Sequence, residues 1–154
     1  MKLGIKKLHE NEWQLHIDSA FVRVDRYSLE LLQIVLGDLL EMDLGQSTSV
    51  IAGHEKLASK LLDLDSTNLQ LILRSIDNED LLKMMVAVNN TKLTEQILEN
   101  VGGIMSQQLE SDARSISIPS DEEAIESIKK IVEKMYELEA LGKIEFKSYE
   151  SRFI

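Results

Sequence analysis

The feature that most constrains the fold is a series of helix start signals that recur about every dozen residues in the middle of the chain. Asp65, Asp77 and either Asn90 or Thr91 each stand just before a group of apolar residues at helical spacing. An Asp or Asn in this position accepts hydrogen bonds from the free amides of a first helical turn. Helices this short are marginal in isolation. The series therefore predicts a stack of short helices that bury their apolar faces against one another.

A longer helix is predicted after Pro119. Ser120 and Glu123 form a Ser-x-x-Glu capping box, and the first turn is acidic, as the helix dipole favours. Apolar residues follow at helical spacing: Ala124, Ile125, Ile128, Ile131, Val132, Met135, Leu138 and Leu141. Gly142 is the expected C-terminal cap, and residues 143–146 alternate as in a short extended tail.

The stretch 61–146 resembles the C-terminal domain of the flagellar motor switch protein G, a rotor component. The match runs without gaps and covers more than half of the chain. It is carried by four short segments: Leu61-Leu-Asp-Leu-Asp65, Ile76-Asp77-x-x-Asp80-Leu81, Asn100-Val101 and Glu133-x-x-x-x-Leu138-Glu-x-x-Gly142-x-Ile144. No single segment is specific; their collinear order is. The resemblance implies an armadillo-like, right-handed stack of helices, protein–protein interaction and no enzyme activity.

The chain departs from this family at the positions that matter for torque. In the family, a set of charged residues on this domain faces the stator. The positions in register here are Ala87, Ile104, Ser111, Asp112 and Ser120, of which Asp112 alone keeps an expected charge. A hinge motif rich in Met and Phe normally precedes the domain, and Glu55-Lys56-Leu57-Ala58 stands in its place. We interpret the scaffold as kept and the torque surface as lost.

The first 44 residues have a different pattern. Trp13, Leu15 and Ile17 alternate with polar residues, and residues 21–25 alternate less cleanly, which predicts a β-hairpin with a tight connection at residues 18–20. Ile5 and Leu8 could add a strand or a turn. Residues 27–43 carry a broad leucine-rich stripe and are predicted to form a helix. Residues 1–44 are therefore expected to form a small ββα unit that docks on the rest of the chain or dimerises.

The segment 45–53, GQSTSVIAG, is the expected linker, because small and polar residues dominate it and both ends are Gly. The predicted organisation is a ββα unit at 1–44, a linker at 45–53, a helical domain at 54–146 and a tail at 147–154. Within the helical domain, Gly102-Gly103 predicts a break followed by a helix over 104–112, and residues 114–119 read as a connector. The expected fold class is mainly α, α+β overall.

Composition excludes several classes of function. The net charge of -10 argues against nucleic acid and anionic membrane surfaces, because affinity for phosphates comes from Lys and Arg. The chain has no Cys, which removes disulfides and thiolate chemistry and fits a reducing cytoplasm. No apolar run is long enough to span a membrane or to form a signal peptide. A small basic patch of Lys6, Lys7, Arg23 and Arg26 is too weak to reverse the expectation on nucleic acid.

Residues that could carry chemistry have simpler explanations. His9, His16 and His54 are not paired with other ligands at metal-binding spacing. The acidic clusters stand at helix starts, where capping and the dipole account for them. No phosphate-binding loop or nucleophile elbow is present. We therefore expect no catalytic residue, no metal and no cofactor.

The candidate partner surface comprises Asp112, Trp13, Arg114 and Phe153. Trp13 could instead pack on its own helix, and the apolar tip of the tail could be frayed rather than bound. The first hypothesis is a cytoplasmic adaptor or regulator that binds a rotor or stator component of the flagellar motor. The second is a self-assembling structural protein that dimerises through the stripe of residues 27–43. A divergent enzyme is the least favoured alternative.

Overall fold

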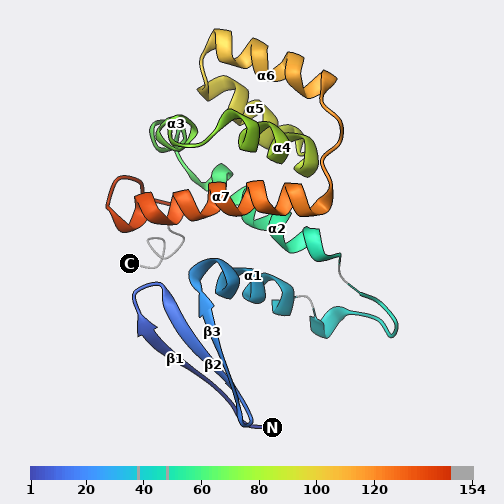
Figure 1. Cartoon of the computed structure of the whole chain (residues 1–154), viewed down its shortest axis with the longest axis vertical. Coiled ribbons are helices and arrows are strands. Elements are labelled where there is room, and N and C mark those ends of the chain that lie inside the picture. The colour runs from blue at the N-terminus through green and yellow to red at the C-terminus, as the bar shows by residue number, and fades with distance from the viewer. Residues whose placement is uncertain (38, 48, 147–154) are drawn as a thin grey trace. The chain divides into compact units, whose positions relative to one another are not determined.

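The computed structural model describes residues 1–37, 39–47 and 49–146, drawn in colour in Figure 1. The chain divides into two compact units, Met1–Gly53 and His54–Ile154. The first contains a small sheet and the second is helical throughout its regular elements. This confirms the predicted class, mainly α with strands at the N-terminus. The assignment of residues 45–53 to a linker between domains stays a prediction.

The sheet of the first unit is an antiparallel meander of β1 (Leu3–His9), β2 (Glu12–Ile17) and β3 (Ala20–Asp25). The predicted hairpin corresponds to β2 and β3. Asp18 closes its turn with a positive φ of 53°, and the Asp18 carboxylate accepts a 2.6 Å hydrogen bond from the backbone amide of Lys2. This bond and the strand ladder hold β1 in place.

The unit thus has three strands, so the predicted ββα description was one strand short. The sequence left Ile5 and Leu8 as part of either a strand or a turn. Both residues belong to strand β1, in which Ile5 pairs with Leu15 of β2. The alternation of apolar and polar residues did not predict β1, because Lys6 and Lys7 interrupt it and the register shifts between Lys7 and His9.

The helix that follows is shorter than predicted. Helix α1 spans Arg26–Gly37 rather than 27–43, and a 3₁₀ turn, η1, spans Leu39–Glu41. Gly37 is a poor helix residue, which favours an end at this point. Helix α2 (Val50–Ala58) begins four residues before the predicted restart at His54. Its start is marked by Ser49, whose Oγ accepts a 3.3 Å hydrogen bond from the amide of Ala52.

The helical unit continues from α2 through the 3₁₀ turn η2 (Ser59–Asp63). It then has α3 (Ser66–Ser75), α4 (Asn78–Val88), α5 (Thr91–Asn100), α6 (Gly103–Ser115) and α7 (Asp121–Ala140). Helix α7 packs on α3 and α4, α5 packs on α3, and α6 packs on α4 and α5 (Figure 1). The largest fully buried side chains all belong to this unit: Leu57, Leu61, Leu69, Ile72, Leu81, Met84, Leu93, Ile97, Leu109, Ile128, Ile131 and Met135.

The predicted caps are largely confirmed. Asp65 accepts a 2.8 Å hydrogen bond from the amide of Asn68, and Asn90, not Thr91, caps α5 by accepting from the amide of Leu93 at 3.0 Å. Ser120 caps α7 through the amide of Glu123 at 3.2 Å. Asp77 occupies the cap position of α4, but its side chain makes no capping hydrogen bond.

Helix α7 ends in a Schellman motif at the predicted glycine. Gly142 has a φ of 71°, its amide donates to the carbonyl of Glu139, and the amide of Lys143 donates to the carbonyl of Leu138, both at 2.9 Å. The chain after it returns to the core, because Ile144 is buried and Asn68 of α3 donates to the carbonyl of Glu145 at 3.2 Å.

Helix α6 is longer than the predicted 104–112. It starts at Gly103, after Gly102 with a φ of 91°, and runs to Ser115. The amide of Ile116 still donates to the carbonyl of Asp112 at 2.9 Å, so the helical bonding continues through the first residues of the predicted connector.

Candidate interaction surface

Helix α6 presents an exposed side that is largely uncharged. Leu109 is buried against the neighbouring helices, and the uncharged residues of the opposite side are here called the α6 face: Ile104, Gln107, Gln108, Ser111 and Ser115. The exposed Glu110 and Arg114 flank this face. Ile104 is 90% exposed. A large apolar side chain so fully in water contributes nothing to the core, so its position is available to a partner.

The charges near this face are few. Asp112 is half-buried beside it, and its carboxylate accepts a 2.9 Å hydrogen bond from Nε2 of Gln108. Arg114 is exposed in the last turn of α6. Residues two apart on a helix do not share a face, so Asp112 and Arg114 cannot act as one charged pair toward a partner.

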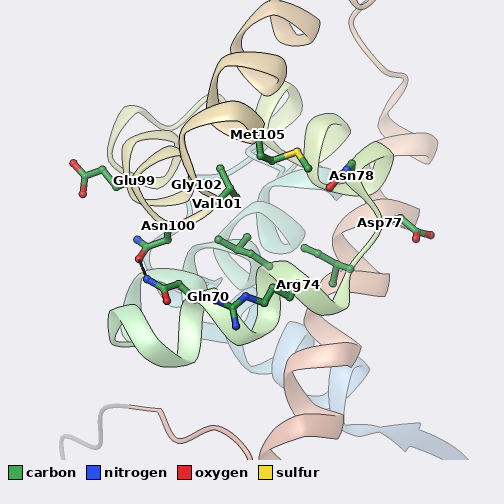
Figure 2. A pocket seen from close by; sticks show the side chains of 11 residues that line it. Gln70, Arg74, Asp77, Asn78, Glu99, Asn100, Val101, Gly102 and Met105 are labelled. Atoms are coloured by element: carbon green, nitrogen blue, oxygen red, sulfur yellow. Dashed lines mark hydrogen bonds between the residues drawn. The ribbon is translucent and has the colours of Figure 1, made fainter.

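A pocket of about 630 Å³ lies where the ends of α3, α4, α5 and α6 meet, and Figure 2 shows its lining. Its side chains combine an apolar base with a mixed polar rim, and they are Gln70, Leu73, Arg74, Ile76, Asp77, Asn78, Glu99, Asn100, Val101 and Met105, with Gly102 at the edge. Nε2 of Gln70 donates to Oδ1 of Asn100 at 3.2 Å, which joins α3 to α5. The lining has one cation, two carboxylates and no His, Ser or Lys, so it lacks a nucleophile with a base beside it.

Two acidic residues at the starts of these helices, Asp80 of α4 and Glu123 of α7, make contacts between α4 and α7. Lys83 lies between Glu79 at 3.2 Å and Glu123 of α7 at 3.8 Å. The hydrogen bond with Glu79 raises the pKa of Lys83 above its usual value. Oγ of Ser127 donates to Oδ1 of Asp80 at 2.9 Å.

The other predicted surface residues lie elsewhere. Trp13 is half-buried on β2 in the first unit, where Nζ of Lys7 lies 5.5 Å from the centre of its ring. Phe153 falls outside the described residues. Asp112 and Arg114 share α6 and Trp13 belongs to the first unit, and the four-residue partner surface stays a prediction.

Three further findings bear on function. In the described ranges, no group of three or more His, Cys, Asp or Glu side chains is placed to hold a metal ion. Across the same ranges, no helix combines the length and the hydropathy needed to cross a bilayer. Burial lowers the pKa of His54 below its usual value, with a smaller contribution from the charge of Lys129, so this histidine is neutral at pH 7.

The sequence identified Ile104 as a departure from the family's charged positions, but it did not predict that Ile104 is an exposed apolar residue. The signal was present, because Gly102-Gly103 sets the start of α6 and places Ile104 in its first turn, three residues ahead of Gln107 and five ahead of the buried Leu109. The pocket could not be predicted, because it is formed by the ends of four helices whose packing angles are not encoded by local pattern.

A stack of short capped helices on one long helix is an arrangement typical of helical protein-interaction domains. The family model for the FliG C-terminal domain matches residues 57–146. This match covers more than half of the 154 residues, and the chain therefore belongs to that family. The resemblance predicted over residues 61–146 is confirmed, and the family implies a part in flagellar motor switching through contacts with other proteins. No curated protein matches the chain.

Proposed function

We propose that this protein is a non-enzymatic adaptor or regulator of the flagellar motor, acting at the cytoplasmic face of the membrane through its partners. The family supports the motor context, because the FliG C-terminal domain is a motor component. The partner is a protein of the rotor or the stator. The chain binds it through the helical unit and needs no cofactor.

The observation that carries this proposal is the composition of the α6 face. The resemblance places the family's charged ridge at positions that include Ile104, Ser111 and Asp112. Here Ile104 and Ser111 are exposed and uncharged, while Asp112 is half-buried and bonded to Gln108. A surface of this kind suits a partner that offers apolar and hydrogen-bonding groups rather than an opposite array of charges. The protein would therefore bind motor components without transmitting torque, which the family's charged domain does.

The test is co-purification of the tagged full chain from its native cell, with Ile104→Asp as the variant. An acid in the first turn of α6 is favoured by the helix dipole, so the variant should fold. Ile118→Asp is the matched control, since Ile118 is 85% exposed and lies beyond the other end of α6. We expect a rotor or stator component with the wild type and with Ile118→Asp, and its loss with Ile104→Asp.

Two results would contradict the proposal. Recovery of metabolic enzymes without any motility component would remove the motor context. Equal recovery of a motor component by Ile104→Asp would keep the context and remove the α6 face as the interface.

Self-association through the stripe of residues 27–43 stays the alternative. Leu36 of α1 is 52% exposed, which leaves part of that stripe available. Light scattering of the full chain over a range of concentrations distinguishes the two: a stable dimer favours self-assembly, and a monomer at all concentrations removes it.

A further inference from the structure

The first unit contains an apolar groove that the proposed function does not use. Helix α1 packs on β3 and β2, and β1 is the strand farthest from it in the sheet order (Figure 1). A groove of about 950 Å³ opens between β1 and α1. Gln33 is the one polar side chain in its lining. The other lining residues are apolar residues of both elements and of β2, with two glycines: Met1, Leu3, Ile5, Leu15, Ile17, Leu29, Leu32, Leu36, Gly4 and Gly37.

The side chains of this groove are exposed to a degree unusual for their type. Leu3 is 66% exposed, Ile5 is 55% exposed and Leu36 is 52% exposed. Leu3 and Ile5 come from the strand, and Leu36 comes from the helix opposite. Contiguous apolar surface of this kind, with two walls and an open top, is typical of a binding site for an apolar partner.

No charged residue of the described ranges lines the groove, and the strand that forms one of its walls carries lysines and no acid. Lys2, Lys6 and Lys7 fall within six consecutive residues, and no acid stands between residues 1 and 9, while the chain as a whole has a net charge of -10. In the ladder Lys7 pairs with Trp13 and Ile5 pairs with Leu15, so Lys7 shares the face of the apolar residues. Lys6 pairs with Gln14 and lies on the opposite face. Among the described residues, Lys2, Lys6 and Lys7 make no ion pair with a carboxylate.

We propose that this groove binds an amphipathic helix of another protein, with its apolar stripe between β1 and α1 and acidic residues along the flank that meets Lys7. Lys7, on the same face of β1 as the apolar residues, selects an acidic flank, and the two apolar walls select a helix that offers one continuous stripe. At usual rises, a helix of about 15 residues spans a seven-residue strand such as β1. The proposal concerns the first unit and is independent of the role of α6.

A strand added to the edge of β1 is a poorer fit than a helix. Adjacent lysines on an edge strand disfavour pairing with another strand, and the register of β1 shifts between Lys7 and His9. The apolar side chains point out of the plane of the sheet, where a docked helix meets them and an added strand does not.

The experiment measures binding of the full chain to a labelled synthetic peptide by fluorescence anisotropy. The peptide is a helix with a leucine stripe and glutamates on its flanks; a second peptide has the same stripe and lysines instead. Ile5→Glu is the test variant, and Phe21→Glu is its matched control, because Phe21 is 62% exposed on the other face of the same sheet. Lys7→Glu tests the charge at a residue that does not line the groove.

We expect the acidic peptide to bind the wild type and Phe21→Glu, and to bind Ile5→Glu at least about tenfold more weakly. Lys7→Glu should weaken the acidic peptide and not the basic one, and added salt should weaken the acidic peptide further. If the basic peptide binds the wild type as tightly as the acidic one, the assignment of an acidic partner is wrong.

Two other occupants would overturn the proposal. If the acidic peptide fails to bind and light scattering shows a dimer that Ile5→Glu dissociates, the groove is filled by a second copy. If the peptide fails to bind, the chain is monomeric, and Ile5→Glu but not Phe21→Glu lowers the midpoint of thermal unfolding, the groove is covered by the chain itself.

Discussion

The hydroxyl of Ser127 on α7 donates a 2.9 Å hydrogen bond to Oδ1 of Asp80 on α4. Ser127 is 2% exposed, and it is a polar residue within the apolar stripe of α7. Around it, Lys83 bridges Glu79 and Glu123. The bond therefore links two helices that carry much of the core.

Ser127→Ala is expected to destabilise the protein by about 1 to 2 kcal/mol, because Asp80 loses its partner at a half-buried position. The midpoint of urea unfolding measures the loss. Ser111→Ala, on the exposed side of α6, is the control and should change the midpoint little. A double-mutant cycle with Asp80→Ala isolates the pair, and additivity of the two single changes would show that the bond contributes nothing.

The two aspartates at helix starts are expected to differ. Asp65 bonds the amide of Asn68, whereas the side chain of Asp77 makes no capping bond. Asp65→Ala should cost about 1 kcal/mol in the free energy of unfolding, and Asp77→Ala should cost less, on the order of the helix dipole term alone. Denaturant unfolding of the two variants checks this. An equal loss for both would mean that the capping bond of Asp65 is not what stabilises α3.

Two glycines are expected to respond to alanine with opposite signs. Gly142 has a φ of 71°, which an L-residue adopts at a cost, so Gly142→Ala should destabilise by about 1 kcal/mol or more. Gly103 begins α6, and a Cβ there would meet no atom within 4 Å, so Gly103→Ala should stabilise by a few tenths of a kcal/mol to about 1. Thermal unfolding of each variant measures the sign. A stabilising Gly142→Ala would contradict the Schellman motif.

Stability is expected to fall in mild acid because of His54. Burial lowers its folded-state pKa below the usual value of 6.5, so the unfolded chain takes up the proton first as the pH drops. The contribution is therefore complete above the unfolded pKa and is lost as the pH falls from that value toward the lower folded pKa. Urea midpoints measured about one pH unit above and below 6.5 give the slope. In His54→Gln the slope over that range should be smaller, and an unchanged slope would assign the effect to other groups.

Local signals predicted the helical unit well. Asp65, Asn90 and Ser120 are caps because a side-chain oxygen needs only its own helix to bond, and Gly142 ends α7 because one residue there needs a positive φ. The start of α2 was missed for the opposite reason. Small polar residues around Ser49 read as a linker, although the same serine is a cap.

The rest depends on tertiary structure. The sequence did not decide between a strand and a turn at β1, because Lys6 and Lys7 break the alternation. Its pairing with β2 is what makes this segment a strand. Among the candidate site residues, Asp112 was predicted at the end of a helix and Arg114 in the connector after it, whereas both lie on α6. The bond that ties Asp112 to Gln108 was not predicted. The pocket and the groove arise between elements, so no single stretch of sequence encodes them.

The position of α7 in the chain has a consequence for biosynthesis. Its side chains complete the buried interior beneath α3 and α4, yet it is the last helix of the described chain to leave the ribosome. Until Leu138 has emerged, the earlier short helices lack their largest packing partner and remain individually marginal. The helical unit therefore completes its native core only after α7 has been synthesised.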